Sequence, residues 1–273
     1  MPIKATLQWT EKVSPTAIRM RWRSDQTELP FIAGQFYRFR FQDDRGSFQR
    51  SYSFAQCDDA CAPGDFELLI TPVVDGRATE LLFGDSAQLE AEIEGPYGRL
   101  VLPPSGRKLV LAATSAGLAP YLPMLKALES KSPLPFERVH LLFGVREPQE
   151  FLYRDWIETF AERNSWFDWQ VFYSQTLPLD PGPVEFQGYL HAGLELLDLD
   201  PQSDWILLCG NPMMIDTAFE SAKLRGFKAR RVIREKYLFA RQEKQSEALS
   251  MSEADRALLL AKMARYGKSD SGD

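Results

Sequence analysis

The sequence has few of the residues that bind metals or form disulfides. Its 273 residues include three cysteines, Cys57, Cys61 and Cys209, and two histidines, His140 and His191. Three thiolates are too few for an iron–sulfur cluster that needs four, and too few for a disulfide scaffold. We therefore expect no metal site, structural roles for both histidines, a reducing cytoplasmic location, and a separate molecule for any iron–sulfur partner.

Long apolar runs and an excess of positive charge are also missing. No run reaches the roughly 20 residues of a membrane-spanning helix, so no membrane span is expected. The 38 acidic residues outnumber the 32 basic ones, and the net charge of −6 argues against nucleic acid as the main partner. The hydrophobic fraction of 44% and the length are sufficient for two domains of ordinary size.

The first hundred residues are β-rich. Polar and apolar residues alternate at 6–9, 17–22 and 37–41, and turn-forming residues separate such runs. Short, regularly spaced strands predict an antiparallel barrel, which we place at residues 1–103. The segment Leu102-Pro103-Pro104-Ser105-Gly106 is a plausible linker after it.

The pattern changes from residue 108. A continuous apolar run at 109–113 is typical of a strand in a sheet that is covered on both faces. Further strand-like runs at 139–143, 169–173 and 205–209 alternate with helix-like segments. This alternation predicts a doubly wound parallel α/β domain at 104–237. A capping-box-like segment at 252–255 predicts that the remaining extension, 238–273, is partly helical.

Two short motifs carry the chemistry. Arg50-Ser51-Tyr52-Ser53 lies in a predicted strand and offers a cation, an aromatic ring and a small hydroxyl. A flat, anionic, redox-active cofactor needs such groups for its phosphate, its ring face and its ring nitrogen. Cys209-Gly210-Asn211-Pro212 follows an apolar strand and opens a helix-like segment, where an α/β domain binds a dinucleotide. Two cofactor sites indicate electron or hydride transfer between them.

Together with other segments, these motifs resemble the ferredoxin–NADP reductase family in type and order. The other segments are Gly34-Gln35-Phe36, Gly76-x-x-Thr79-x-x-Leu82, Gly95-Pro96-Tyr97-Gly98, Gly117-Leu118-Ala119-Pro120, Phe143-Gly144-Val145-Arg146 and Arg234-Glu235-Lys236-Tyr237. The resemblance covers roughly residues 5–237. It implies a six-stranded flavin-binding barrel followed by a nicotinamide-dinucleotide domain. The implied enzyme is FAD-dependent and transfers electrons between NAD(P)H and a separate ferredoxin or flavodoxin, by hydride transfer at flavin N5.

The resemblance also implies the flavin-binding residues. Arg50, with Ser51 beside it, would bind the pyrophosphate, Tyr52 would stack on the flavin ring, and Ser53 would hydrogen-bond near N5. The loop Gly76, Arg77, Ala78 and Thr79 would hold a phosphate at a helix start, with the Thr79 hydroxyl able to cap that helix. The choice of FAD over FMN depends mainly on this loop. Ordinary structural roles, such as a strand arginine or a plain helix cap, are the alternatives.

For the nicotinamide coenzyme the resemblance implies two loops. The first contains Ser115, Ala116, Gly117 and Pro120, and the second contains Cys209, Gly210, Asn211 and Pro212. Ser115 and Ala116 stand where the family usually has glycine and threonine, so the first turn has less conformational freedom. Ser174-Gln175 stands where many NADPH-using relatives have Ser-Arg, and Arg146 and Arg154 are other cations for a 2′-phosphate. We favour NADPH, with NADH as the alternative.

Ser53, Cys209 and Tyr237 are the predicted catalytic residues, and Tyr237 is the candidate aromatic cover of the flavin. Phe239 and Tyr266 compete for that role, because the chain continues after Tyr237. Arginines on the barrel strands could steer an acidic carrier, although we favour simple solvated faces for most of them: Arg19, Arg21, Arg23, Arg38 and Arg40. Three functional alternatives remain: a flavin or quinone reductase, a reductase subunit docked on an oxygenase, and a module without nicotinamide binding.

Overall fold

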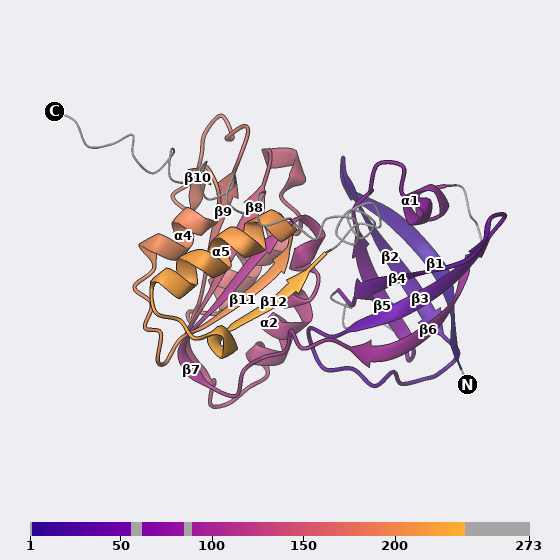
Figure 1. Cartoon of the computed structure of the whole chain (residues 1–273), viewed down its shortest axis with the longest axis horizontal. Coiled ribbons are helices and arrows are strands. Elements are labelled where there is room, and N and C mark those ends of the chain that lie inside the picture. The colour runs from indigo at the N-terminus through magenta and orange to yellow at the C-terminus, as the bar shows by residue number, and fades with distance from the viewer. Residues whose placement is uncertain (1, 56–61, 85–88, 238–273) are drawn as a thin grey trace, which may run out of the picture. The chain divides into compact units, whose positions relative to one another are not determined.

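The computed structural model describes residues 2–55, 62–84 and 89–237. The predicted extension at 238–273, with Phe239 and Tyr266, lies outside the described residues, as do Cys57 and Cys61. Two six-stranded sheets form the described part of the chain (Figure 1). Within this part, no helix is both long and apolar enough to cross a membrane.

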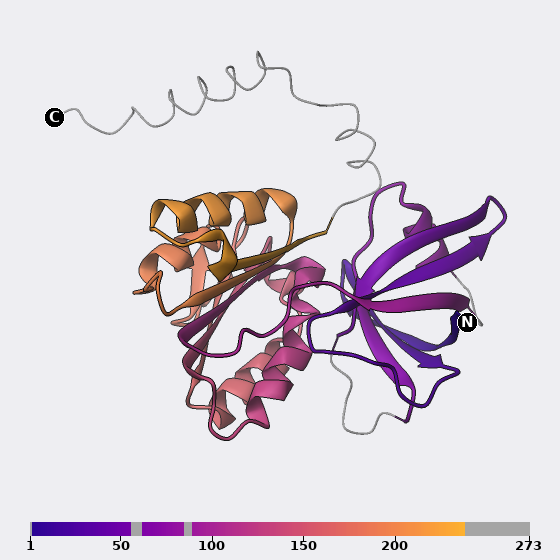
Figure 2. The same ribbon diagram turned by 60° about the horizontal axis from the view of Figure 1, so that its bottom comes forward.

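The first sheet is antiparallel and has the strand order β4-β3-β6-β1-β2-β5. Figure 2 shows its strands, in indigo to magenta, from a second direction. Its strands are β1 (Ile3–Ser14), β2 (Ala17–Ser24), β3 (Phe36–Asp43), β4 (Gly46–Ser53), β5 (Asp65–Ile70) and β6 (Glu90–Tyr97). The edge strands β4 and β5 meet just after β4, where Phe54 bridges to Leu68 and the Ala55 amide donates to the Glu67 carbonyl at 2.8 Å. The sheet therefore closes on itself, which confirms the predicted six-stranded barrel.

Alternation along each strand determines what the barrel encloses. On β3, Tyr37, Phe39 and Phe41 are buried, whereas Arg38 and Arg40 between them are exposed. Successive side chains of a strand point to opposite faces, so the three aromatic rings enter the barrel core. There Phe39 and Phe41 pack around Trp22 of β2.

The second sheet is parallel throughout and has the order β10-β9-β8-β7-β11-β12. Its strands are β7 (Gly106–Thr114), β8 (Phe136–Val145), β9 (Phe167–Tyr173), β10 (Glu185–Gln187), β11 (Trp205–Gly210) and β12 (Val232–Lys236). The apolar runs indicated the four inner strands. They did not indicate β10 and β12, because a three-residue edge strand and a five-residue strand that ends in three consecutive charged residues lack such a run.

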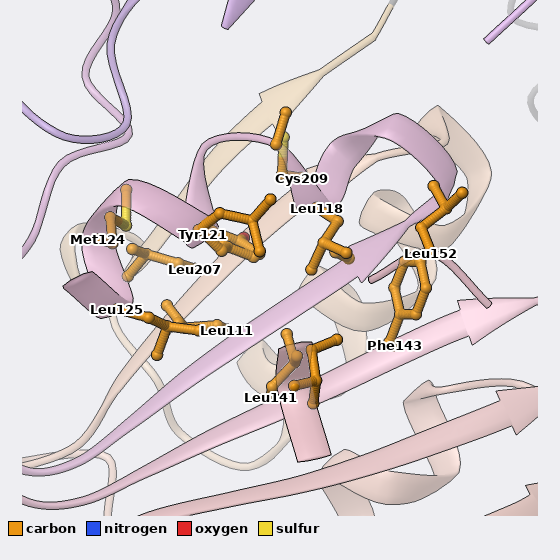
Figure 3. Close-up of a cluster of buried hydrophobic side chains, with 14 of the residues drawn as sticks. Leu111, Leu118, Tyr121, Met124, Leu125, Leu141, Phe143, Leu152, Leu207 and Cys209 are labelled. Carbon is orange, nitrogen blue, oxygen red and sulfur yellow. The ribbon is translucent and has the colours of Figure 1, made fainter. Parts of the chain in front are cut away.

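Helices cover both faces of the second sheet, which confirms the doubly wound prediction (Figure 1). One face packs against α2 (Tyr121–Glu129) and α3 (Arg154–Arg163), and the other against α4 (His191–Leu196) and α5 (Pro212–Leu224). Figure 3 shows the buried side chains on the face covered by α2 and α3. Leu111, Leu141 and Leu207 come from three strands, and Tyr121 and Leu125 come from α2. The continuous apolar runs are explained by this two-sided burial.

Candidate functional site

The strand order of the parallel sheet reverses between β7 and β11, and open α/β sheets bind ligands at the carboxyl ends of the two strands beside such a point. The two ends are in close contact. Gly210 has a φ of 120°, and a Cβ atom there would lie 2.6 Å from the carbonyl oxygen of Thr114. The Asn211 amide donates to the Thr114 hydroxyl at 3.0 Å. Glycine at position 210 allows this approach, because any side chain would clash.

The loop after β7 is a turn of 3-10 helix at Ser115–Leu118. Ser115 has a φ of 53°, the left-handed conformation that glycine adopts without strain. Thus serine takes the conformation of the glycine that it replaces in the motif. A Cβ on Gly117 would lie 2.4 Å from the carbonyl oxygen of Cys209, so Gly117 packs the loop against β11. Pro120 is the N-cap of α2, immediately after this loop.

The loop after β11 leads directly into α5, which begins at Pro212 as predicted for a first helical residue. The side-chain oxygen of Asn211 accepts hydrogen bonds from the amides of Met213, at 2.8 Å, and Met214, at 3.4 Å. Asn211 is therefore the N-cap of α5, and its side chain fixes the position of the helix start.

A chain of hydrogen bonds joins the end of β4 to β12 and the residue after it. The Tyr237 hydroxyl donates to Ser53 Oγ at 3.1 Å, and Ser53 Oγ donates to Glu235 Oε1 at 3.1 Å. The Tyr237 amide bonds to the Gly210 carbonyl at 2.9 Å, which holds this tyrosine beside the end of β11. We call these three residues the Ser53–Glu235–Tyr237 cluster.

Cys209 completes this group, so the structure brings the three predicted catalytic residues together. The Cys209 side chain is buried and lies in hydrogen-bond contact with the Tyr237 hydroxyl. Burial raises the pKa of the Cys209 thiol well above its usual value, so the sulfur is a neutral thiol. Burial also raises the pKa of Tyr237. Neither group is ionised near neutral pH.

Glu235 is the member of the site to which the sequence analysis assigned no role. Burial raises the pKa of its carboxyl group to about 7, although the hydrogen bond from Ser53 acts in the opposite direction. A carboxyl group with such a pKa can both hold and release a proton near neutral pH. Its position two residues before Tyr237, in the terminal motif, was the only sequence signal for it.

The predicted flavin-binding residues lie on β4, before Ser53. Arg50 donates a hydrogen bond to the Gln49 carbonyl at 2.6 Å, and no described carboxylate pairs with it. Its guanidinium carbon lies 5.5 Å from the centre of the Phe48 ring, and that of Arg77 lies 4.4 Å from the same ring. Tyr52 packs edge-on against Phe39 and points to the same side of β4 as Arg50. Ser51 faces the other side and is exposed.

The loop at Gly76–Thr79 corrects one expectation. The helix α1 (Arg77–Leu82) starts two residues before Thr79, with Gly76 as its N-cap and no side-chain cap. Thr79 therefore does not cap the helix; its hydroxyl accepts a hydrogen bond from the Val73 amide at 2.8 Å and closes the loop. Ala78 is in the first turn of α1. The Arg77 side chain forms an ion pair with Asp43 and donates to the Gly46 carbonyl at 2.6 Å.

Other predicted residues lie away from this cluster. Arg146 pairs with Glu150, and Arg154 pairs with Glu158 and Glu185. Ser174 follows β9, and its amide donates to the Val145 carbonyl at 2.9 Å. Carboxylates pair with four arginines of the barrel stripes, namely Arg19, Arg21, Arg23 and Arg40, while Arg38 lies over the Tyr97 ring. Arg23, Arg38 and Arg40 are exposed, as expected for solvated faces, whereas Arg21 is largely buried and pairs with the buried Glu67.

The described residues fit both cofactors. Arg50 has guanidinium N–H groups without an acceptor among the described residues, as a phosphate-binding residue requires, and it lies three residues before Ser53 on the same strand. The loops after β7 and β11 are made of small residues, and they meet where the strand order reverses. This is the position at which open α/β sheets bind dinucleotides.

Comparisons with known proteins agree with this geometry. Residues 4–102 match the oxidoreductase FAD-binding domain, and residues 111–220 match the oxidoreductase NAD-binding domain. The toluate 1,2-dioxygenase electron transfer component of Pseudomonas putida is 27% identical over 86% of this chain and 67% of its own length. A ferredoxin–NADP reductase of Pseudomonas aeruginosa is 28% identical over 69% of this chain and 76% of its own.

A solved structure shows the same fold. The ferredoxin NADP+ reductase of Neisseria gonorrhoeae, crystallised with FAD and NADP, has a TM-score of 0.73 and 23% identity, over 86% of this chain and 99% of that one. The two domains thus define a flavoenzyme oxidoreductase that binds FAD and NAD(P). The chain belongs to the ferredoxin–NADP reductase-like family, whose members among its relatives include ferredoxin–NADP reductases and dioxygenase reductase components.

Proposed function

We propose that this protein takes hydride from NAD(P)H onto FAD and passes electrons to a separate ferredoxin or flavodoxin. The observation that carries the proposal is the Ser53–Glu235–Tyr237 cluster with Cys209. It joins the end of a barrel strand to the ends of β11 and β12. A flavin held by the barrel and a nicotinamide delivered by the parallel sheet would both need to reach this place.

Each cofactor has its proposed binding residues. Arg50 and Tyr52 of β4 hold FAD, together with Ser51 and the loop Gly76, Arg77, Ala78 and Thr79. The small-residue loops hold NAD(P)H, through Ser115, Ala116, Gly117 and Pro120 after β7, and Cys209, Gly210, Asn211 and Pro212 after β11. FAD, when bound, supplies the chemistry of accepting a hydride and releasing electrons singly. The chain supplies position, exclusion of water and control of a proton.

The proton is controlled at Ser53 Oγ. This hydroxyl accepts a hydrogen bond from Tyr237 and donates its own proton to Glu235. Because burial raises the pKa of Glu235 to about 7, its carboxyl group can hold or release a proton near neutral pH. A proton that Glu235 gives to Ser53 requires Ser53 to pass its own proton on, so that the hydroxyl stays neutral. Cys209 remains a neutral thiol and limits the space beside Tyr237.

The identity of the electron acceptor is a separate part of the proposal. Relatives named ferredoxin–NADP reductase support a ferredoxin-type carrier. The dioxygenase electron transfer components among the relatives favour a second candidate, a reductase component of an oxygenase. This chain spans 67% of the toluate and 61% of the anthranilate dioxygenase component. The full activity of these relatives therefore cannot be assigned to this chain from the matched domains. A cytoplasmic location remains a prediction from the cysteine content.

Spectroscopy and turnover test the proposal. The purified protein is expected to show the visible absorbance of FAD, which NADH or NADPH should bleach without oxygen. Reduction of cytochrome c should then depend on added ferredoxin or flavodoxin, and free flavin or quinone should be a poor substitute. A colourless protein, prepared with sufficient FAD, would contradict the proposal that this is a flavoenzyme. Turnover that does not depend on either carrier would contradict only the proposed electron acceptor.

A further inference from the structure

The path of the coenzyme across the sheet follows from the position of the cluster, if the proposed function holds. The nicotinamide end has to reach Ser53 and Cys209, at the end of β11, and the pyrophosphate fits the loop after β7. In the sheet, β7 lies between β11 and β8. An extended dinucleotide that crosses from β11 over β7 therefore places its adenosine half at the carboxyl ends of β8 and β9.

The residues that follow these two strands form one continuous edge. Arg146 and Glu147 follow β8, and Ser174 and Gln175 follow β9. The Ser174 amide bonds to the Val145 carbonyl at 2.9 Å, and the Gln175 amide bonds to the Arg146 carbonyl at 2.9 Å. The adenosine ribose, with its 2′-hydroxyl in NADH or its 2′-phosphate in NADPH, would meet this edge.

Glu150 binds the Arg146 side chain at this edge. Arg146 Nε donates to Glu150 Oε2 at 3.0 Å, and a second guanidinium nitrogen donates to Oε1. The Arg146 amide and the Thr16 hydroxyl also donate to Glu150, each at 3.3 Å. The Glu150 side chain is only 11% exposed, whereas that of Arg146 is 57% exposed. The carboxylate is thus held from several sides and keeps the guanidinium against it.

The other cation near this edge is bound in the same way. Arg154, at the start of α3, donates to Glu158 at 3.0 Å and to Glu185 at 2.8 Å. Among the described residues of this edge, the carboxylates Glu147, Glu150, Glu158 and Glu185 outnumber the two arginines. A doubly charged 2′-phosphate needs charge-assisted hydrogen bonds from free guanidinium or ammonium groups, whereas a 2′-hydroxyl does not.

We propose that this protein prefers NADH to NADPH, and that Glu150 sets the preference by holding Arg146 away from a 2′-phosphate. Without the Glu150 carboxylate, Arg146 would be free to bind a 2′-phosphate, so Glu150 is the specificity-determining residue. This choice reverses the preference for NADPH that we drew from the sequence. The reason is that the ion pairs of Arg146 and Arg154 become visible only in the folded chain.

Calorimetric binding of two nucleotides tests the inference on the FAD-loaded protein without relying on turnover. Adenosine 5′-monophosphate and adenosine 2′,5′-bisphosphate differ only in the 2′-phosphate. We expect the wild type to bind the bisphosphate at least tenfold more weakly. Glu150→Gln should shift the ratio of the two dissociation constants at least tenfold toward the bisphosphate, and adding Arg146→Gln should remove that gain. Glu220→Gln also removes one carboxylate from an ion pair, with Lys223 on α5, but it lies outside this edge and should leave the ratio unchanged.

Each outcome of these measurements contradicts a different part of the proposal. Tighter binding of the bisphosphate by the wild type would overturn the NADH preference, and this comparison needs no variant to fold. An unchanged ratio in folded Glu150→Gln, or a gain that survives Arg146→Gln, would overturn the role of Glu150. If neither nucleotide binds, the dinucleotide site of the proposed function fails, and the inference fails with it. Steady-state kcat/KM for NADH and NADPH should follow the same order.

Discussion

Ser53 Oγ donates a 3.1 Å hydrogen bond to Glu235 Oε1, although the two residues are 182 positions apart in the sequence. Ser53 is the last residue of a barrel strand, and Glu235 lies in the final strand of the parallel sheet. Two domains that each bind one cofactor thus share a hydrogen bond at the place where the cofactors would meet. Hydride transfer and the pH dependence of stability should both depend on this contact.

Removing the Ser53 hydroxyl should slow hydride transfer. We expect Ser53→Ala to lower the rate of flavin reduction by NAD(P)H by about 10²-fold, because loss of a contact that positions the reacting groups can cost that much. Anaerobic stopped-flow absorbance measures this rate. Ser47→Ala, which changes an exposed serine of the same strand, is the control. Equal rates for the two variants would remove Ser53 from the mechanism.

Glu235 should make stability depend on pH. Burial raises its pKa from 4.5 to about 7, so the folded protein binds this proton more tightly than the unfolded chain. Its stabilising contribution is therefore complete below pH 4.5 and is lost as the pH rises through 7. The loss amounts to at most about 3 kcal/mol.

Urea unfolding of wild type and Glu235→Gln across this range tests the prediction. The wild type should lose free energy of unfolding relative to the variant as the pH rises. A constant difference between the two proteins would show that Glu235 has an ordinary pKa.

Arg50→Ala should weaken FAD binding. A charge-assisted hydrogen bond contributes about 1.5–3 kcal/mol, so we expect the dissociation constant for FAD to rise by roughly 10-fold to 100-fold. Quenching of flavin fluorescence during titration measures it. Arg40→Ala removes an exposed arginine of the neighbouring strand, which pairs with Glu92, and should leave FAD affinity unchanged. The idea fails if both variants bind FAD as the wild type does.

Gly117→Ala should destabilise the protein, because the added Cβ would lie 2.4 Å from the Cys209 carbonyl oxygen. Forcing an atom into a packed contact costs about 1–3 kcal/mol of unfolding free energy. Gly182→Ala is the matched control, since its Cβ would meet its nearest neighbour at an ordinary 3.4 Å. Chemical denaturation compares the two, and a stable Gly117→Ala would contradict the close packing of this loop against β11.

Ser115 should respond differently to glycine and to valine. Its left-handed conformation, with a φ of 53°, costs a residue with a side chain about 1–2 kcal/mol. Glycine removes this strain but loses about 0.5–1 kcal/mol in backbone entropy, so Ser115→Gly should be neutral or slightly stabilising. Ser115→Val should be destabilising by more than 1 kcal/mol, since a branched Cβ is least tolerated there. Thermal unfolding distinguishes the two, and equal midpoints would contradict the strain.

Much of the fold follows from local patterns in the chain. The alternation at 37–41 indicated a barrel strand, and the continuous run at 109–113 indicated a strand covered on both faces; both are confirmed. The pattern missed β10, because three residues carry too little periodic signal. It also placed a capping role on Thr79, although the helix starts earlier, at Arg77, and the hydroxyl bonds to the Val73 amide.

The sequence alone determined the types of chemical group available and their order along the chain. Arg50, Tyr52 and Ser53 lie within four residues at the end of a single strand, so their positions along the chain were enough to group them. Only the tertiary structure decided which distant groups act together. It brought Glu235 and Tyr237 to Ser53, buried Glu235 so that its pKa rose, and paired Arg146 with Glu150. Hydrogen bonds, burial and ion pairs depend on distances in space, and these arise only when the chain is folded.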